Sequence, residues 1–236
     1  MSDGRQTYDY SIRVSPRAKR IILKVSPDRG LEVVVPREID RKRVPEVIAR
    51  RRSWIEKQFD SFLRSGVRPG ETAQLPAAIE FAATGERFEV SRIERPGRSD
   101  VKITGPNRLL LCASEVEEGV SLLRRWLKKH ARDRLVPMLR ETGRETGLDF
   151  ARVQVRLQRS RWASCSARGT VSLNARLMFL PPELVNYVFV HELCHTKHMN
   201  HSGEYWRTVA GFIPDFEQLE ARLKREGRRL VPAWAA

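Results

Sequence analysis

Four of the chain's five histidines lie between His191 and His201, a stretch of eleven residues. His191 and His195 are four residues apart, so on a helix their side chains project from the same face, and Glu192 lies beside them. Two imidazoles at this spacing are typical of zinc sites, in which zinc lowers the pKa of a bound water and the glutamate acts as general base. We therefore predict a zinc-dependent hydrolytic site with His191 and His195 as metal ligands and Glu192 as the catalytic base.

A catalytic zinc needs a third protein ligand and leaves its fourth position for water. Two histidines can supply that ligand, His198 and His201. If the helix continued, His198 would lie about 7 to 8 Å from the metal along the helix axis, which is too far for an imidazole. Asn200 tolerates the left-handed conformation that ends many helices, so the chain can turn there and return His201 to the metal. We predict His201 as the third metal ligand and place His198 at the helix end, in solvent or in support of the ligands.

The spacing of ten residues from His191 to His201 equals that of the metzincin proteases. His198, however, occupies the position of the glycine at which the metzincin chain turns, and no methionine follows Met199 to form the Met-turn. The sequence therefore disfavours a metzincin.

Length and composition limit the class of protein. With 236 residues, of which 41% are hydrophobic, the chain can bury a substantial core. It has no run of about 18 apolar residues, and its first residues lack the apolar core of a secretory signal, so we expect no membrane span and a cytoplasmic location. Three cysteines without paired spacing, Cys112, Cys165 and Cys194, argue against a disulfide framework and agree with a reducing compartment.

The chain is strongly basic. It has 44 lysines and arginines against 29 aspartates and glutamates, which gives a formal net charge of +15. Such an excess attracts polyanions, including nucleic acid, nucleotides and anionic lipid, but scattered arginines can equally serve only to solvate the surface. One candidate for contact with nucleic acid is the basic group Arg13, Arg17, Lys19 and Arg20.

The first part of the chain alternates short apolar runs with polar turns. This pattern predicts a β-meander and then a helix that Asp40 can cap, with strands at about 10–15, 20–26 and 31–36 and the helix at about 41–64. The stretch GVRPGETAQLP, rich in turn-forming residues, interrupts the pattern. We take residues 1–70 as a unit with a β-meander and a helix.

Strands and long helices alternate in the rest of the chain. Strands are expected at about 79–83, 87–93, 100–104, 108–112, 153–158 and 170–174. A long helix begins near Ser114, and Pro137 either kinks it or starts a new one. A further helix starts at the prolines 181 and 182 and carries the histidines, and a last one covers about 215–229. We expect a β-rich connecting region at 71–113 and a metal-binding catalytic region at 114–236, within one continuous unit.

The stretch from His191 to Trp206, with H-E-L-C-H, then N-H-S and then Y-W, resembles the YgjP-like metallopeptidase family. This family was formerly a numbered domain of unknown function and is related to the SprT- and Wss1-type zincin proteases. Upstream, a second block is similar to one of that family, with Ala163 in place of its usual glycine, and it consists of Gln158, Arg161, the W-A-S-C run at 162–165 and Leu173–Asn174. The segment SPRAKRIILKV is similar to the family's arginine-rich hairpin.

The resemblance implies an α+β, zincin-like metallopeptidase fold, with a mixed sheet packed on the H-E-x-x-H helix and a β-rich region before it. It also implies His191, His195 and His201 as metal ligands and Glu192 as base. The distance that each imidazole can span gave the same ligands above. In zincins the strand before the metal-binding helix commonly lines the cleft. Residues 170–174 are therefore expected to line it here and to pair with the backbone of a peptide substrate.

Three functions fit these features. The first is a zinc metallopeptidase, and the alternative is a zinc-dependent hydrolase of nucleotides or other phosphorylated small molecules, whose phosphate oxygens the arginines would bind. The third, a nucleic-acid-binding module with structural zinc, is disfavoured because structural zinc sites are usually closed by four Cys or His ligands.

Several polar residues are candidates for supporting roles. A substrate or its developing oxyanion needs a cation or a hydrogen-bond donor, which Arg161, Tyr205 or His198 can supply. Asn174 and Gln158 can hydrogen-bond to the metal ligands and orient them, or they can only cap turns.

Overall fold

The structure is a computed structural model that describes residues 9–16, 18–26, 30–39, 41–64, 74–94, 99–158 and 160–236. Its backbone contacts divide the chain into two units, Met1–Ala73 and Gln74–Ala236. The three-part division expected from the sequence remains a prediction. Within the described residues, none of the helices combines the length and the apolar character needed to cross a membrane.

The first unit holds a three-stranded sheet whose strand order differs from the order along the chain. The strands are β1 (Tyr10–Val14), β2 (Ile22–Ser26) and β3 (Gly30–Val35), with β3 between the other two. β1 pairs with β3 in parallel and β2 pairs with it antiparallel, so the predicted β-meander is wrong. The apolar run of β3 explains the difference, because every residue of β3 is buried and only a central strand can bury both faces.

The helix expected at 41–64 is present but divided. η1 (Arg41–Arg43) leads into α1 (Val44–Arg50), and α2 (Arg52–Arg64) follows a break at Arg51, where φ is −106° and ψ is 13°. Asp40, the expected cap, lies outside the described residues. Apolar residues of β2, β3, α1 and the segments next to them form the core of the unit: Val33, Val35 and Val44, with Ile21, Leu23, Ile39 and Ile48 packed against them.

The basic group near the start of the chain is described only in part, because Arg17 lies outside the described residues. Arg13 on β1 forms an ion pair with the buried Glu32 on β3, and its Nε lies 3.0 Å from Oε1. Arg13 therefore neutralises a carboxylate of its own unit. Lys19 and Arg20 are exposed. A nucleic-acid contact stays a prediction.

The second unit begins with a four-stranded mixed sheet. Its strands are β4 (Ala78–Phe81), β5 (Glu86–Ile93), β6 (Asp100–Gly105) and β7 (Arg108–Cys112), in the order β4-β5-β7-β6. β5 and β7 are parallel, and the other two pairs are antiparallel.

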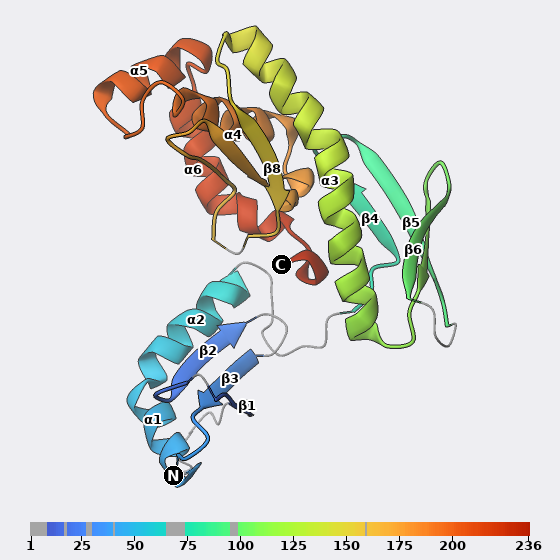
Figure 1. The fold of residues 1–236 in the computed structure, drawn as a ribbon, viewed down its shortest axis with the longest axis vertical. Coiled ribbons are helices and arrows are strands. Elements are labelled where there is room, and N and C mark those ends of the chain that lie inside the picture. The colour runs from blue at the N-terminus through green and yellow to red at the C-terminus, as the bar shows by residue number, and fades with distance from the viewer. Residues whose placement is uncertain are drawn as a thin grey trace. The chain divides into compact units, whose positions relative to one another are not determined.

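The long helix α3 (Val116–Thr146) connects the two halves of the second unit. It contacts β6 and β7 on one side and β8 and α4 on the other, and Figure 1 shows it passing between them. The helix continues through Pro137, which removes one backbone hydrogen bond. Leu135 and Leu139 are fully buried on either side of Pro137, and their packing holds the helix together there.

A three-stranded sheet and three helices complete the second unit. β8 (Arg152–Arg156) is parallel to β10 (Thr170–Asn174), which lies between it and the antiparallel β9 (Ala163–Cys165). The helices are α4 (Pro182–Cys194), α5 (Gly203–Phe212) and α6 (Phe216–Glu226), and three short 3₁₀ helices accompany them: η2 (Ala175–Phe179), η3 (Gly227–Leu230) and η4 (Ala233–Ala235). The mixture of helices and mixed sheets confirms the predicted α+β class.

Candidate metal centre

α4 carries the first part of the histidine motif. It starts with a proline in its first turn, as the sequence predicts, and it holds His191 in its last turn, with His195 as its C-cap. The helix is mostly apolar, and it buries Leu184, Val185, Tyr187, Val188, Phe189, Val190 and Leu193. Packing on most sides fixes the helix, and therefore fixes the backbone from which His191 projects.

The helix ends earlier than the sequence suggested and in a different way. Cys194 is its last residue, and the N–H groups of Thr196 and Lys197 bond to carbonyls three residues back, at 2.9 and 3.1 Å. Among the described residues only glycines have positive φ, so the predicted left-handed turn at Asn200 is wrong. A 3₁₀-type turn takes the chain out of the helix instead.

α5 then brings the chain back toward α4. Ser202 caps α5, and its Oγ accepts a hydrogen bond from the N–H of Tyr205 at 3.4 Å. His201 directly precedes this cap, so the start of α5 determines where its imidazole lies.

The three predicted ligands converge. The Nε2 atoms of His191 and His201 lie 3.3 Å apart, and one ligand atom from each of His191, His195 and His201 lies within 4.8 Å of the other two. Two nitrogens bound to one tetrahedral zinc at about 2.0–2.1 Å are separated by about 3.3–3.4 Å, so this spacing fits a shared ion. No other histidine, cysteine or carboxylate of the described chain joins the group, so a tetrahedral zinc held by these three residues would keep one position for water.

The protonation of the imidazoles also fits a metal. Burial, and then the neighbouring His195 and His201, lower the pKa of His191 to about 4, and burial also lowers the pKa of His195. The ring of His195 donates from Nδ1 to the backbone carbonyl of His198 at 2.9 Å, which leaves the lone pair of Nε2 for a metal. The Nδ1 of His191 is buried without a hydrogen-bond partner among the described residues. Neutral imidazoles are the form that binds metal.

Glu192 is buried beside His191, with 6% of its surface exposed. Burial raises the pKa of Glu192 to about 7, against the opposing effects of a hydrogen bond from the backbone N–H of Cys165 and of the charge of Arg161. A carboxyl group with a pKa near neutrality can both accept and release a proton in that range.

The strand that faces Glu192 is β9, one of the two edge strands of its sheet. The N–H of Asn174 bonds to the carbonyl of Trp162, and this register turns the backbone groups of Ala163 and Cys165 away from β10. The prediction that residues 170–174 pair with the backbone of a peptide substrate is therefore wrong. They form β10, which lies between β8 and β9 and has no free edge.

Asn174 and Gln158 support the segment that leads into β9. Asn174 is 2% exposed, and its Nδ2 donates to the backbone carbonyls of Gln158 and Arg161, each at 2.7 Å. Gln158 thus takes part through its backbone rather than through its side chain. The side chain of Arg161 is exposed, while its backbone is held in place.

Two of the three residues predicted to contact substrate, Tyr205 and His198, form hydrogen bonds within the protein instead. Tyr205 is fully buried, its hydroxyl donates to the backbone carbonyl of His191 at 3.1 Å, and its ring stacks on His195 at 4.6 Å. A side chain held in this way cannot reach a substrate. The Nε2 of His198 lies 3.2 Å from Oγ1 of Thr208, and the three-ligand group does not include it.

Sequence reasoning missed two features of the site. The first is the backbone N–H of Cys165, which donates to Glu192. A backbone donor cannot be recognised from the residue type. The second is an aromatic stack in which Trp206 lies on His201 at 5.5 Å and Phe216 lies on Trp206 at 5.1 Å. This stack orients the ring of His201, and nothing in the sequence separates Trp206 from an ordinary packing residue.

Comparison with known proteins shows the family of the chain. The model of a family described as "YgjP-like, metallopeptidase domain" matches residues 19–226, and the chain belongs to this family. It is therefore a metallopeptidase, as the sequence resemblance predicts.

Two solved structures of metallopeptidase zymogens are similar to part of the chain. Abylysin of Pyrococcus abyssi has 26% identity over 39% of this chain and 97% of its own, with a TM-score of 0.35. Jannalysin of Methanocaldococcus jannaschii has 18% identity over 39% of this chain and 94% of its own, also with a TM-score of 0.35. A comparison with curated proteins found no match.

Proposed function

We propose that the chain is a zinc metallopeptidase in which His191, His195 and His201 hold the metal and Glu192 is the general base. The observation that carries this proposal is the convergence of three imidazoles beside a buried carboxyl group, in a chain of a metallopeptidase family. Histidine nitrogens suit zinc, and three of them with one open position are typical of catalytic rather than structural zinc sites.

When bound, a zinc ion in such a site activates water for attack and polarises the attacked carbonyl. The carboxylate of Glu192 accepts a proton from the attacking water and delivers it to the leaving nitrogen. The N–H of Cys165 holds that carboxylate in one orientation. We assign to Arg161 the stabilisation of the negative charge that develops on the carbonyl oxygen, because its exposed guanidinium lies close enough to act on Glu192.

The proposed substrates are peptides and proteins in extended form. β9 has an open edge next to Glu192, and an extended backbone can pair with such an edge as an additional strand. The alternative of nucleotide or phosphate-ester hydrolysis has no support from the family. We propose no nucleotide substrate.

The test is the substitution Glu192→Gln, which removes the base and keeps the shape of the side chain. The variant should retain about one zinc per chain, as three protein ligands would hold it, and should lose nearly all turnover of a denatured protein substrate. Zinc is measured by elemental analysis, and turnover by release of new amino termini.

The matched control is Glu183→Gln, the same change on the same helix at a residue that pairs with Arg222. It should leave turnover unchanged. An active Glu192→Gln variant would exclude Glu192 as base. Release of phosphate from nucleoside triphosphates, without any peptide cleavage, would replace the proposed substrate class.

A further inference from the structure

A polar network outside the metal centre holds the segment that leads into β9. We call residues 157–162, between β8 and β9, the site loop; Arg159 within it lies outside the described residues. Asn174 donates to two carbonyls of this loop, those of Gln158 and Arg161, and its Oδ1 accepts from the N–H of Arg176 at 3.1 Å. The turn from β10 into η2 is thus built around the site loop.

Arg176, in η2, makes a second and longer connection. Its Nη1 donates to the backbone carbonyl of Gln158 at 2.9 Å, and its Nε donates to the backbone carbonyl of Ala235 at 2.7 Å. One guanidinium therefore bridges the site loop and the segment Val231–Ala236, which are far apart in the sequence. Two donors in a rigid fork are needed for this, and only arginine offers them.

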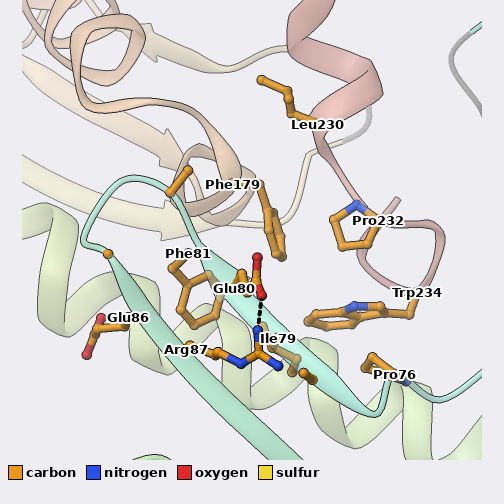
Figure 2. Close-up of a pocket in the computed structure, with 13 residues that line it drawn as sticks. Pro76, Ile79, Glu80, Phe81, Glu86, Arg87, Phe179, Leu230, Pro232 and Trp234 are labelled. Carbon is orange, nitrogen blue, oxygen red and sulfur yellow. Dashed lines mark hydrogen bonds and ion pairs between the residues drawn. The ribbon is translucent and has the colours of Figure 1, made fainter.

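The segment Val231–Ala236 is itself firmly anchored. Arg124 on α3 donates from Nε to the carbonyl of Trp234 at 2.7 Å and from Nη2 to that of Ala236 at 3.0 Å. Trp234 is 4% exposed and packs edge-on against Phe179 of η2, with ring centroids 5.9 Å apart. Pro232, Trp234, Phe179 and residues of β4 line a groove of about 670 Å³. Figure 2 shows these side chains around the groove.

The network ends at Glu192. The site loop passes directly into β9, where Trp162 accepts from the N–H of Asn174 at 2.8 Å and Cys165 donates its own N–H to the carboxylate of Glu192. A shift of the loop would therefore move the donor that orients Glu192 and the backbone that carries Arg161.

We propose that Arg176 is a positioning residue, which couples the segment Val231–Ala236 to the site loop and so holds β9 and Arg161 in place around Glu192. Its role in turnover rests on the proposed function, whereas the coupling itself does not. The family match ends at residue 226, so the outer support of Arg176 lies beyond the matched region.

The chain offers a matched pair for the test. Arg176 and Arg124 each bridge two backbone carbonyls through a fork, and the bridge of Arg176, unlike that of Arg124, ends on the site loop. Lysine keeps the charge and has a single donor group, so Arg176→Lys and Arg124→Lys break equivalent bridges. Hydrogen exchange is measured for the amides of Cys165 and Asn174, and kcat and KM are measured on the zinc-loaded full chain.

Arg176→Lys should raise exchange at both amides at least about tenfold, and it should lower kcat about tenfold with KM and zinc content unchanged, as expected when a reacting group is misplaced. Arg124→Lys leaves the bonds of Arg176 to Gln158 and Ala235 in place, so it should raise exchange only within the segment Val231–Ala236 and leave kcat within about twofold. Equal effects of the two variants on kcat and on the Cys165 amide would overturn the proposal and leave Arg176 a structural residue.

If Arg176→Lys does not fold, exchange in the unaltered protein still tests the network, because unprotected amides at Cys165 and Asn174 would refute it. If the exchange pattern is as expected but no peptidase activity is found in any variant, the coupling stands and the proposed function fails.

Discussion

Replacing Glu86 with glutamine should destabilise the second unit at neutral pH but not in acid. Glu86 lies at the start of β5 and accepts hydrogen bonds from Arg134 Nη2 at 2.7 Å and from Thr84 Oγ1 at 2.8 Å, and it lies 3.1 Å from Nε2 of His130. Arg134 and His130 belong to α3. The carboxylate therefore fastens the four-stranded sheet to the long helix.

The magnitude follows from the pKa of Glu86. Burial alone would raise it, but the hydrogen bonds from Arg134, Thr84 and His130 together outweigh burial and lower it from 4.5 to about 2. One pKa unit corresponds to about 1.4 kcal/mol, and solvent screens the half-exposed Arg134, so we expect the free energy of unfolding to fall by about 2 kcal/mol at pH 7. Because the folded-state pKa is the lower one, this stabilisation is complete above about pH 5 and disappears as the pH falls toward about 2.

Urea unfolding of the metal-free protein at pH 7 and near about pH 2 measures this difference, and removing the metal keeps its release in acid from contributing. The control is Glu80→Gln, because Glu80 pairs with Arg87 on the same pair of strands but both side chains are exposed, at 67% and 61%. That variant should lose less than about 1 kcal/mol. Equal losses in the two variants, or a loss in Glu86→Gln that persists in acid, would refute the reasoning.

His201→Ala should sharply lower the zinc content measured by elemental analysis, whereas His198→Ala should not, because only the backbone carbonyl of His198 contacts His195; the reverse pattern would remove His201 from the ligand set. Tyr205→Phe should keep kcat within about twofold while lowering the free energy of unfolding by about 1 kcal/mol, because its hydroxyl bonds to a helix carbonyl. A large fall in kcat would show that the hydroxyl of Tyr205 takes part in the reaction. Arg161→Ala should lower kcat about 100-fold with peptide substrates, and an unchanged kcat would end its assignment to the oxyanion.

Local sequence patterns predicted where most strands and helices lie, but not which strands pair. β3 and β10 are both central strands, and both are buried along nearly their whole length. The run LEVVV was apolar enough to indicate a central strand, yet chain order favoured a meander. Strand pairing depends on contacts between distant residues, which one sequence does not contain.

The site was predictable where it depends on spacing along one helix. The pairing of His191 with His195 follows from helical periodicity, and the choice of His201 over His198 followed from reach. The turn that returns His201 did not follow, because the chain leaves the helix by 3₁₀ bonds and a cap at Ser202 rather than at Asn200. The N–H of Cys165 was invisible because any residue type except proline can supply it.

The shortness of β9 limits how the proposed enzyme can choose its targets. Two residues, Ala163 and Cys165, turn their backbone groups toward the open edge, and Glu192 already takes the N–H of Cys165. A polypeptide that pairs with this edge can form backbone hydrogen bonds with little more than one residue of β9. Substrate selection then depends less on the sequence of the substrate than on whether a few of its residues are already unfolded.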